Sequence, residues 1–152
     1  MRGQYQIRPF RLSDMDGVEG VERASFGADA YDRNLFAELR DRCGRLFLVA
    51  AAAGGIGGYM VTSVAERRGV LAAELVSVAV GPALRGQGLA SALMRSTLRR
   101  LRLRRVSRLT LAVRVSNRRA QRLYRKFGFA RFRCVRRYYE DGEDALVLGR
   151  PV

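Results

Sequence analysis

Residues 80–90 read Val-Gly-Pro-Ala-Leu-Arg-Gly-Gln-Gly-Leu-Ala, between an apolar run and an amphipathic segment. This order predicts a strand, a glycine-rich loop and then a helix. The first N–H groups of a helix lack partners within it, and the helix dipole adds partial positive charge there. Gly86 and Gly88 have no Cβ, so the backbone can approach a bound group closely. The segment therefore predicts an anion site suited to a pyrophosphate, with Arg85 adding a charged contact.

The glycine spacing excludes two common phosphate loops. No Gly-Lys-Ser/Thr is present, as a P-loop requires, and Ser91 stands where a dinucleotide fingerprint has its third glycine. The remaining pattern, Arg85-x-x-Gly88-x-Ala90, resembles the pyrophosphate loop of the GNAT acetyltransferases. A strand-to-helix turn that uses glycines only for its geometry is the alternative interpretation.

Length and composition narrow the class of protein. The 152 residues suit a single domain, residues 1–152, with its own core. Two cysteines and no histidine leave no zinc-ligand set and no Ser-His or Cys-His catalytic pair, so we expect no metal. The sequence has no apolar signal-peptide region and no run of transmembrane length. We expect a soluble, cytoplasmic protein with reduced thiols and no membrane partner.

The net charge of +15 is unevenly distributed along the chain. Residues 75–139 contain eighteen basic residues and no acidic ones, whereas residues 1–74 contain ten of each. Such a basic block fits polyanionic partners such as CoA, RNA or a ribosome. Arginine outnumbers lysine 28 to 1, so GC-rich coding bias on a solvated surface is the competing explanation.

Hydrophobic periodicity predicts elements in the order β-α-α-β-β-β-α-β-α-β-β. Ser13 is the expected cap of the first helix, and Asp32 or Asn34 that of the second. This order implies a mixed α/β sheet with helices on both faces. The predicted ranges are 5–10, 14–24, 32–42, 45–53, 56–64, 70–80, 87–104, 108–115, 117–127, 129–139 and 144–148.

A second motif supports the resemblance to the GNAT family. Residues 116–129 read Ser-Asn-Arg-Arg-Ala-Gln-Arg-Leu-Tyr-Arg-Lys-Phe-Gly-Phe, and they resemble the family's N-x-x-A-x-x-L-Y-x-x-x-G-F segment. The resemblance implies the GNAT fold: a mixed, mostly antiparallel sheet with helices on both faces and splayed central strands. It also implies that Asn117 contacts the pantetheine arm of acetyl-CoA and that Tyr124 lies near its thiol. A helix cap for Asn117 and a core position for Tyr124 are the plainer interpretations.

The implied reaction is direct acetyl transfer from acetyl-CoA, a co-substrate, to an amine. Tyr124 is a candidate general acid for the leaving thiolate, and a backbone N–H near Val78 to Val80 can polarise the carbonyl. The resemblance implies these cofactor contacts: Val78, Ala79, Val80, Arg85, Gly86, Gln87, Gly88, Leu89, Ala90, Asn117, Ala120 and Tyr124.

The candidate general base is Glu74, because a chain without histidine needs a carboxylate or a water relay to accept the amine proton. Residues 73–80 resemble the central strand of histone-type GNAT enzymes, whose catalytic Glu occupies the matching position. Burial raises the pKa of a carboxylate, so we expect a buried Glu74 to be a useful base. The alternative is a Glu74 that points to solvent or pairs with an arginine.

Residues 137–145, Arg-Tyr-Tyr-Glu-Asp-Gly-Glu-Asp-Ala, resemble a hairpin of the ribosomal-protein N-terminal acetyltransferases, the RimI-like branch of the family. That hairpin helps to form the peptide groove, which implies a protein N-terminal α-amine as acceptor, that of a ribosomal protein included. The implied substrate contacts are Phe26, Tyr31, Tyr138 and Tyr139.

One position departs from that branch. Residues 111–114 read Leu-Ala-Val-Arg, so Ala112 stands where the branch carries a catalytic Glu. A small amine or a lysine side chain therefore remains an alternative acceptor, and a non-catalytic domain that binds CoA or RNA remains an alternative function. The oligomeric state stays open between a monomer and a weak dimer.

Overall fold

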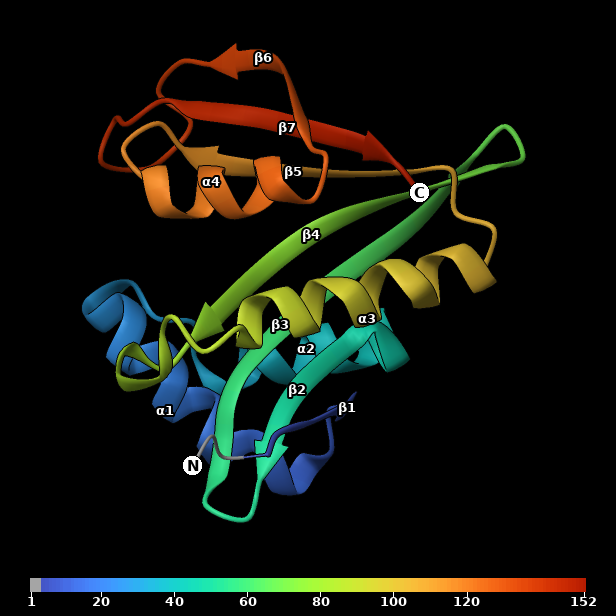
Figure 1. Cartoon of the computed structure of the whole chain (residues 1–152). Helices are drawn as coiled ribbons and strands as arrows, with labels where there is room; N and C mark the ends of the chain where they lie inside the picture. The colour runs from blue at the N-terminus through green and yellow to red at the C-terminus, as the bar shows by residue number, and fades with distance from the viewer. Residues whose placement is uncertain (1–3) are drawn as a thin grey trace. The chain divides into compact units, whose positions relative to one another are not determined.

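The computed structural model describes residues 4–152, and in them hydrogen bonding orders seven strands as β1-β2-β3-β4-β5-β7-β6 (Figure 1). β4 and β5 pair in parallel, whereas β1–β2, β2–β3, β5–β7 and β6–β7 pair antiparallel. This confirms the predicted mixed, mostly antiparallel α/β class. The strands are β1 (Gln6–Pro9), β2 (Phe47–Ala52), β3 (Gly55–Arg67), β4 (Val70–Val80), β5 (Arg108–Arg114), β6 (Ala130–Val135) and β7 (Ala145–Pro151). The helices are α1 (Met15–Phe26), α2 (Arg33–Cys43), α3 (Leu89–Leu103) and α4 (Arg118–Lys126).

The chain divides into two compact units. Unit 1 comprises the residues up to Ser63 together with Val76–Arg100, and unit 2 comprises Val64–Leu75 and Leu101–Val152. A single domain over residues 1–152 stays a prediction.

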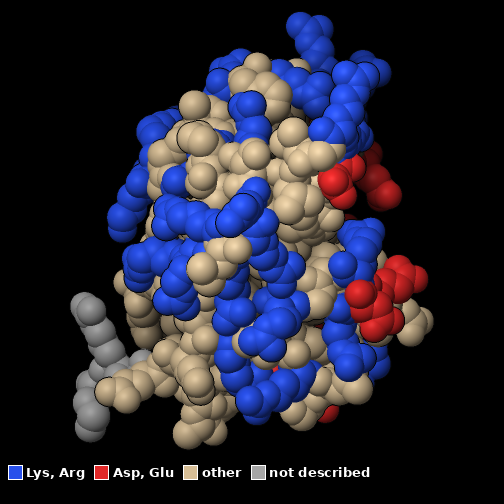
Figure 2. All heavy atoms as spheres, turned by 90° about the vertical axis from the view of Figure 1, so that its right-hand side faces the viewer, with Lys and Arg blue, Asp and Glu red and all other residues tan. Residues whose placement is uncertain are grey.

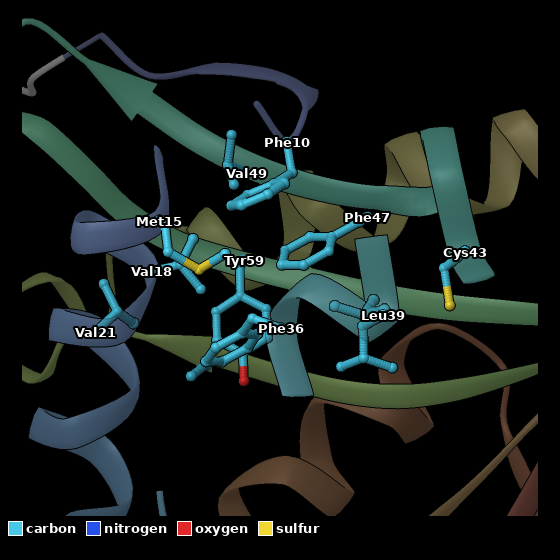
Figure 3. Close-up of a cluster of buried hydrophobic side chains, with 12 residues drawn as sticks. Phe10, Met15, Val18, Val21, Phe36, Leu39, Cys43, Phe47, Val49 and Tyr59 are labelled. Carbon is cyan, nitrogen blue, oxygen red and sulfur yellow. The ribbon is translucent and has the colours of Figure 1, made fainter. Parts of the chain in front are cut away.

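In unit 1, the side chains of β3 point alternately to the two faces of the strand. Side chains in a strand point to opposite faces in turn, so Tyr59 and Val61 join a buried cluster with α1 and α2 (Figure 3). Met60 points the other way and accepts a hydrogen bond at its sulfur from the Thr97 hydroxyl of α3. The cluster consists of Phe10, Met15, Val18, Val21, Phe36, Leu39, Cys43, Phe47, Val49, Tyr59, Val61 and Ala79.

In unit 1, the predicted cap of α2 is confirmed and the predicted cap of α1 is wrong. The Asp32 carboxylate accepts the N–H of Leu35 at 2.9 Å and caps α2, which confirms that interpretation. Ser13 does not cap α1; it lies in a 3-10 turn, Leu12–Asp14, and α1 begins at Met15. The reason is Asp14, whose carboxylate accepts the Arg11 N–H and two bonds from the Arg8 guanidinium.

In unit 2, α4 follows β5, and β6 pairs with β7. The Gln121 side chain of α4 donates to the carbonyl oxygens of Arg114 and Val115 at 2.9 and 3.0 Å, which ties the helix to the end of β5. The prediction of a strand over residues 129–139 is too long, because β6 ends at Val135. After Arg137, which has a positive φ of 51°, Tyr138 and Tyr139 lie in a loop closed by hydrogen bonds to residues 142–144.

Candidate active site

The predicted anion site is an open, glycine-shaped loop in unit 1. Gly86 and Gly88 have φ values of 82° and 83°, a region that favours glycine, and both are exposed. A Cβ at either position would meet no heavy atom of residues 4–152 within 4 Å, so these residues leave the space beside the backbone open. α3 starts at Leu89, two residues later than predicted, and the Ala92 N–H already donates to the Gly88 carbonyl at 3.0 Å. The loop therefore offers unobstructed backbone at a helix N-terminus, and Arg85 beside it is exposed.

Close strand packing holds the beginning of this loop. The Gly81 N–H donates to the Gly57 carbonyl at 2.9 Å, and the Leu84 N–H donates to the Gly81 carbonyl at 2.8 Å. A Cβ on Gly58 would lie only 2.9 Å from the Ala79 carbonyl oxygen, so β3 needs glycine where it approaches this part of β4. Of the other predicted cofactor contacts in unit 1, Ala79 and Leu89 are buried, Val78, Val80 and Ala90 are half-buried, and Gln87 is exposed.

The predicted substrate residues of unit 1 lie at the C-terminal end of α1 and beyond it. Phe26 ends the helix and is 45% exposed. The Tyr31 ring packs edge to face on Phe36, and its N–H donates to Oε2 of Glu22 at 2.9 Å. Sequence reasoning missed Glu22, which is 1% exposed. A lone Glu on a helix carries no signal of burial, because its partners come from distant parts of the chain.

In unit 2, Tyr124 is a buried phenol on α4. Its side chain is 5% exposed, and burial, with a smaller contribution from Tyr139, raises the pKa of Tyr124 to about 12. The group therefore holds its proton at neutral pH, as a general acid must.

Asn117 caps α4. Its Oδ1 accepts the Ala120 N–H at 3.1 Å, which confirms the plainer interpretation of this residue and leaves its expected contact with the pantetheine arm a prediction. Asn117 is exposed and Ala120 is half-buried.

The Tyr138–Tyr139 loop rests on Arg114 at the end of β5. The Arg114 guanidinium lies 4.0 Å from the centre of the Tyr139 ring and donates to Asp141 and Glu143 at 2.8 and 2.9 Å. Glu143 also accepts the Ser116 N–H at 2.9 Å, and Ser116 and Arg114 hold the pKa of Glu143 below its usual value. Tyr138 is 50% exposed and contacts Tyr139 edge to face. The Gly-Glu-Asp motif thus anchors a loop whose outer tyrosine is free to contact a ligand.

The expectation that Glu74 is buried is wrong. Glu74 lies in unit 2 opposite Thr110 of β5, and its side chain is exposed, whereas its neighbours Ala73 and Leu75 are buried. The alternation of strand side chains explains the difference, since two apolar neighbours face inward and the carboxylate faces outward. Glu74 as the general base stays a prediction, without support from burial.

Comparison with known proteins assigns the fold. Residues 13–129 match the model of the acetyltransferase (GNAT) family. The chain belongs to the GNAT family. It is 34% identical, over 97% of this chain and 96% of the relative, to a Bacillus subtilis (strain 168) protein provisionally named a ribosomal protein bS18-alanine N-acetyltransferase. It is 30% identical, over 98% of this chain and 94% of the relative, to an N-alpha-acetyltransferase of Sulfurisphaera tokodaii.

Among solved structures, Ard1 from Thermoplasma volcanium is similar to this GNAT chain with a TM-score of 0.90 and 30% identity, covering 98% of each chain. The family match and these relatives, which are named as enzymes, show that the chain is a GNAT N-acetyltransferase. The separation of β4 and β5 that the family implies stays a prediction; their pairing joins Ala72–Glu74 to Arg108–Thr110.

The surface of this GNAT chain is strongly basic. Figure 2 shows a face on which Lys and Arg side chains predominate over Asp and Glu. Arg95, Arg99 and Arg102 of α3 are exposed, while Leu93, Leu98 and Leu101 of the same helix are buried, as predicted. Within residues 4–152, no helix is long and apolar enough to cross a membrane.

Proposed function

We propose that the protein transfers an acetyl group from acetyl-CoA to the N-terminal α-amine of a protein. The observation that carries the proposal is Tyr124, a buried phenol at the tyrosine position of the family motif, which like any ordinary phenol is protonated at neutral pH. Such a group can donate to a thiolate as it leaves, which is the role that the family motif assigns to this position.

The unit 1 loop fits the diphosphate of acetyl-CoA. Its glycines leave the backbone open, the N-terminus of α3 adds partial positive charge, and Arg85 adds a full one. Bound acetyl-CoA supplies the activated acetyl thioester. The chain's own part is to orient that thioester along Val78 to Val80, polarise its carbonyl with a backbone N–H, and hold a proton on Tyr124 for the thiolate.

A peptide N-terminus is the acceptor that the Tyr138–Tyr139 loop supports best. Arg114, Asp141 and Glu143 fix this loop, and Tyr138 is exposed beyond it, so a rigid aromatic edge is available to an extended chain. One relative is provisionally named a ribosomal protein bS18-alanine N-acetyltransferase, and the other is named an N-alpha-acetyltransferase. The α-amine of a ribosomal protein is our first candidate, and Phe26 and Tyr31 are candidate contacts for its first residues.

The arginine face of α3 supports an acidic partner, RNA or the ribosome, that would bring the enzyme close to such substrates. Arg95, Arg99 and Arg102 are exposed, and none of the three forms a salt bridge among residues 4–152. Attraction through such charges raises encounter rates and weakens with salt.

The deciding experiment measures acetyl-CoA turnover on matched acceptors. One peptide has a free α-amine and no lysine; a second has its α-amine blocked and one internal lysine; polyamines form the third group. We expect turnover of the first peptide alone. Turnover of the lysine peptide or of the polyamines alone would contradict the N-terminal assignment, and acetyl-CoA binding without any turnover would favour the non-catalytic domain.

A further inference from the structure

In unit 1, the side chains of Glu22, Tyr59 and Ser77 form a hydrogen-bonded series that takes no part in the reaction described so far. Glu22 on α1 is 1% exposed and Tyr59 on β3 is fully buried (Figure 3 shows Tyr59 in its cluster). The Tyr59 hydroxyl donates to Oε1 of Glu22 at 2.5 Å, and the other Glu22 oxygen accepts the Tyr31 N–H at 2.9 Å. The Ser77 hydroxyl of β4 lies 2.7 Å from the Tyr59 oxygen. Within residues 4–152, no Lys or Arg forms a salt bridge with Glu22.

The donors and acceptors in this hydrogen-bonded series run in one direction. Tyr59 has one hydroxyl proton and gives it to Glu22, so its oxygen can only accept from Ser77. That bond uses the one hydroxyl proton of Ser77. The Ser77 oxygen therefore offers only lone pairs to any further group, and its natural partner is an N–H donor.

Ser77 is the accessible end of this hydrogen-bonded series. Ser77 is half-buried, whereas the side chains of Tyr59 and Glu22 are buried. Ser77 also precedes Val78 to Val80 directly, the strand segment along which the proposed function places the thioester. An amine that attacks there would come close to the Ser77 oxygen.

We propose that Ser77, Tyr59 and Glu22 accept the proton of the attacking amine in sequence, a step that rests on the function proposed above. As the nitrogen forms its bond to the acetyl carbon and the carbon–sulfur bond breaks, the N–H proton passes to the Ser77 oxygen. The Ser77 proton passes to Tyr59, and the Tyr59 proton passes to the Glu22 carboxylate, which becomes neutral. The thiolate takes the Tyr124 proton. Glu22 then returns its proton through the same chain to solvent, and Tyr124 regains one from solvent, so no other reactant is needed.

The surroundings of the Ser77–Tyr59–Glu22 series suit a relay that moves protons without ionising its hydroxyls. Burial, and then the nearby Glu22 carboxylate, raise the pKa of Tyr59 far above its usual value, and Tyr31 adds to this in the same direction. α2 presents the apolar Phe36 ring to Tyr59 at 5.4 Å. The charged Arg33 of α2 is engaged with Asp16 and Glu19 of α1. β3 and β4 contribute the two hydroxyls themselves.

The Ser77–Tyr59–Glu22 series also explains how the enzyme acts without histidine and with Ala112 at the position where the RimI-like branch carries a catalytic Glu. The acceptor of the proton lies on α1, a long way along the sequence from both positions where a base is expected. Glu74 is the competing base, and it is exposed in unit 2.

The test compares Tyr59→Phe and Ser77→Ala with one matched control and with a variant of the competing base. Tyr59→Phe keeps the ring, and Ser77→Ala removes only the accessible end, so the second serves if the first fails to fold. Thr62→Val is the matched control, because Thr62 lies on the same strand, is fully buried, and its hydroxyl has no hydrogen-bond partner among residues 4–152. Glu74→Gln tests the competing base. Circular dichroism and acetyl-CoA affinity establish that each variant is folded and binds its co-substrate.

We expect Tyr59→Phe and Ser77→Ala to lower kcat at neutral pH on the order of 100-fold, the scale of general base catalysis. The loss should shrink at high pH, where hydroxide can take the proton, and the solvent isotope effect on kcat should change. Thr62→Val should keep the wild-type pH profile, whereas a pH-dependent loss in Glu74→Gln alone would assign the proton to Glu74. A role confined to packing would lower kcat equally at every pH.

Three results would overturn the relay. They are wild-type kcat in folded Tyr59→Phe and Ser77→Ala, a loss that does not depend on pH, or a pH-dependent loss confined to Glu74→Gln. Each leaves the proposed function standing, provided that the wild-type enzyme acetylates the free α-amine. If the wild-type enzyme acetylates no amine, the proposed function fails, and the relay fails with it.

Discussion

The N–H of Phe129 donates to the carbonyl oxygen of Tyr124 at 3.0 Å, and their rings meet edge to face with centroids 5.6 Å apart. Gly128 makes this possible with a φ of 84°, and its own N–H donates to the Arg125 carbonyl at 3.0 Å. The two bonds form a Schellman motif at the end of α4, with its usual hydrophobic contact. The last residues of the family motif thus hold the helix turn that carries the candidate acid.

Gly128→Ala should therefore destabilise the protein. A Cβ there meets no atom of the described residues 4–152 within 4 Å, so the cost is backbone strain, about 1 kcal/mol of unfolding free energy. Urea unfolding measures it. The matched control is Gly20→Ala within α1, where a Cβ also meets nothing and φ is not positive; that change should stabilise by up to about 1 kcal/mol. Equal effects at the two sites would contradict the cap.

Tyr124→Phe should lower kcat and leave acetyl-CoA affinity nearly intact, because the hydroxyl matters most as the thiolate leaves. Since the pKa of Tyr124 is about 12, wild-type kcat should not fall through ionisation of this group below about pH 11. Steady-state kinetics and calorimetry check both statements. Unchanged kcat in the variant would remove Tyr124 from the reaction.

The same pKa predicts the sign of an alkaline stability change. The folded pKa of Tyr124 lies above the ordinary value of 10, so the unfolded chain loses the proton first. Stability from this group is present below pH 10 and is lost as pH rises from about 10 to 12. The wild-type unfolding free energy should therefore fall more steeply across that window than that of Tyr124→Phe.

Gly88→Trp should abolish acetyl-CoA binding by filling the open space of the loop. Because Gly88 has a φ of 83°, any side chain strains it, and Gly88→Ala is the control that shares the strain without the bulk. Arg85→Ala should weaken binding by about 1–3 kcal/mol, the scale of a charged hydrogen bond. Calorimetry that gives wild-type affinity for both Gly88→Trp and Arg85→Ala would rule out the loop as the phosphate site.

Thr62→Val should raise the unfolding free energy by about 1 kcal/mol, because the buried Thr62 hydroxyl finds no hydrogen-bond partner among residues 4–152 and a hydroxyl buried in this way loses its hydration on folding. Valine has nearly the same shape and suits a strand. Thermal unfolding of the variant measures the gain. A lower Tm would show that the hydroxyl has a partner in solution, such as a water molecule.

Changing Arg95, Arg99 and Arg102 to Gln should leave turnover of a short free peptide unaltered and reduce association with RNA or ribosomes. The wild-type association should weaken steeply as salt rises. Filter binding and ribosome sedimentation at two ionic strengths measure it. The absence of any salt-sensitive association in the wild type would favour coding bias as the origin of these arginines.

The sequence by itself determined the order of the elements, the glycine loop at the start of α3 and the family. Each depends on local pattern: periodicity, the conformational freedom of glycine, and motifs whose residues lie within one turn or one helix. The cap at Asp32 and the exposed arginines of α3 followed from the same local rules.

Only the tertiary structure decided which polar groups are buried and with what partners. Glu74 and Glu22 are both single carboxylates in amphipathic elements, yet one is exposed and the other is enclosed. Glu22 accepts from the Tyr59 hydroxyl on a strand and from the Tyr31 N–H in a loop. At the start of α1, Asp14 pairs with Arg8, and Ser13 does not cap the helix. Burial and charge pairing depend on residues far apart in the chain, so the pattern around one residue cannot reveal them.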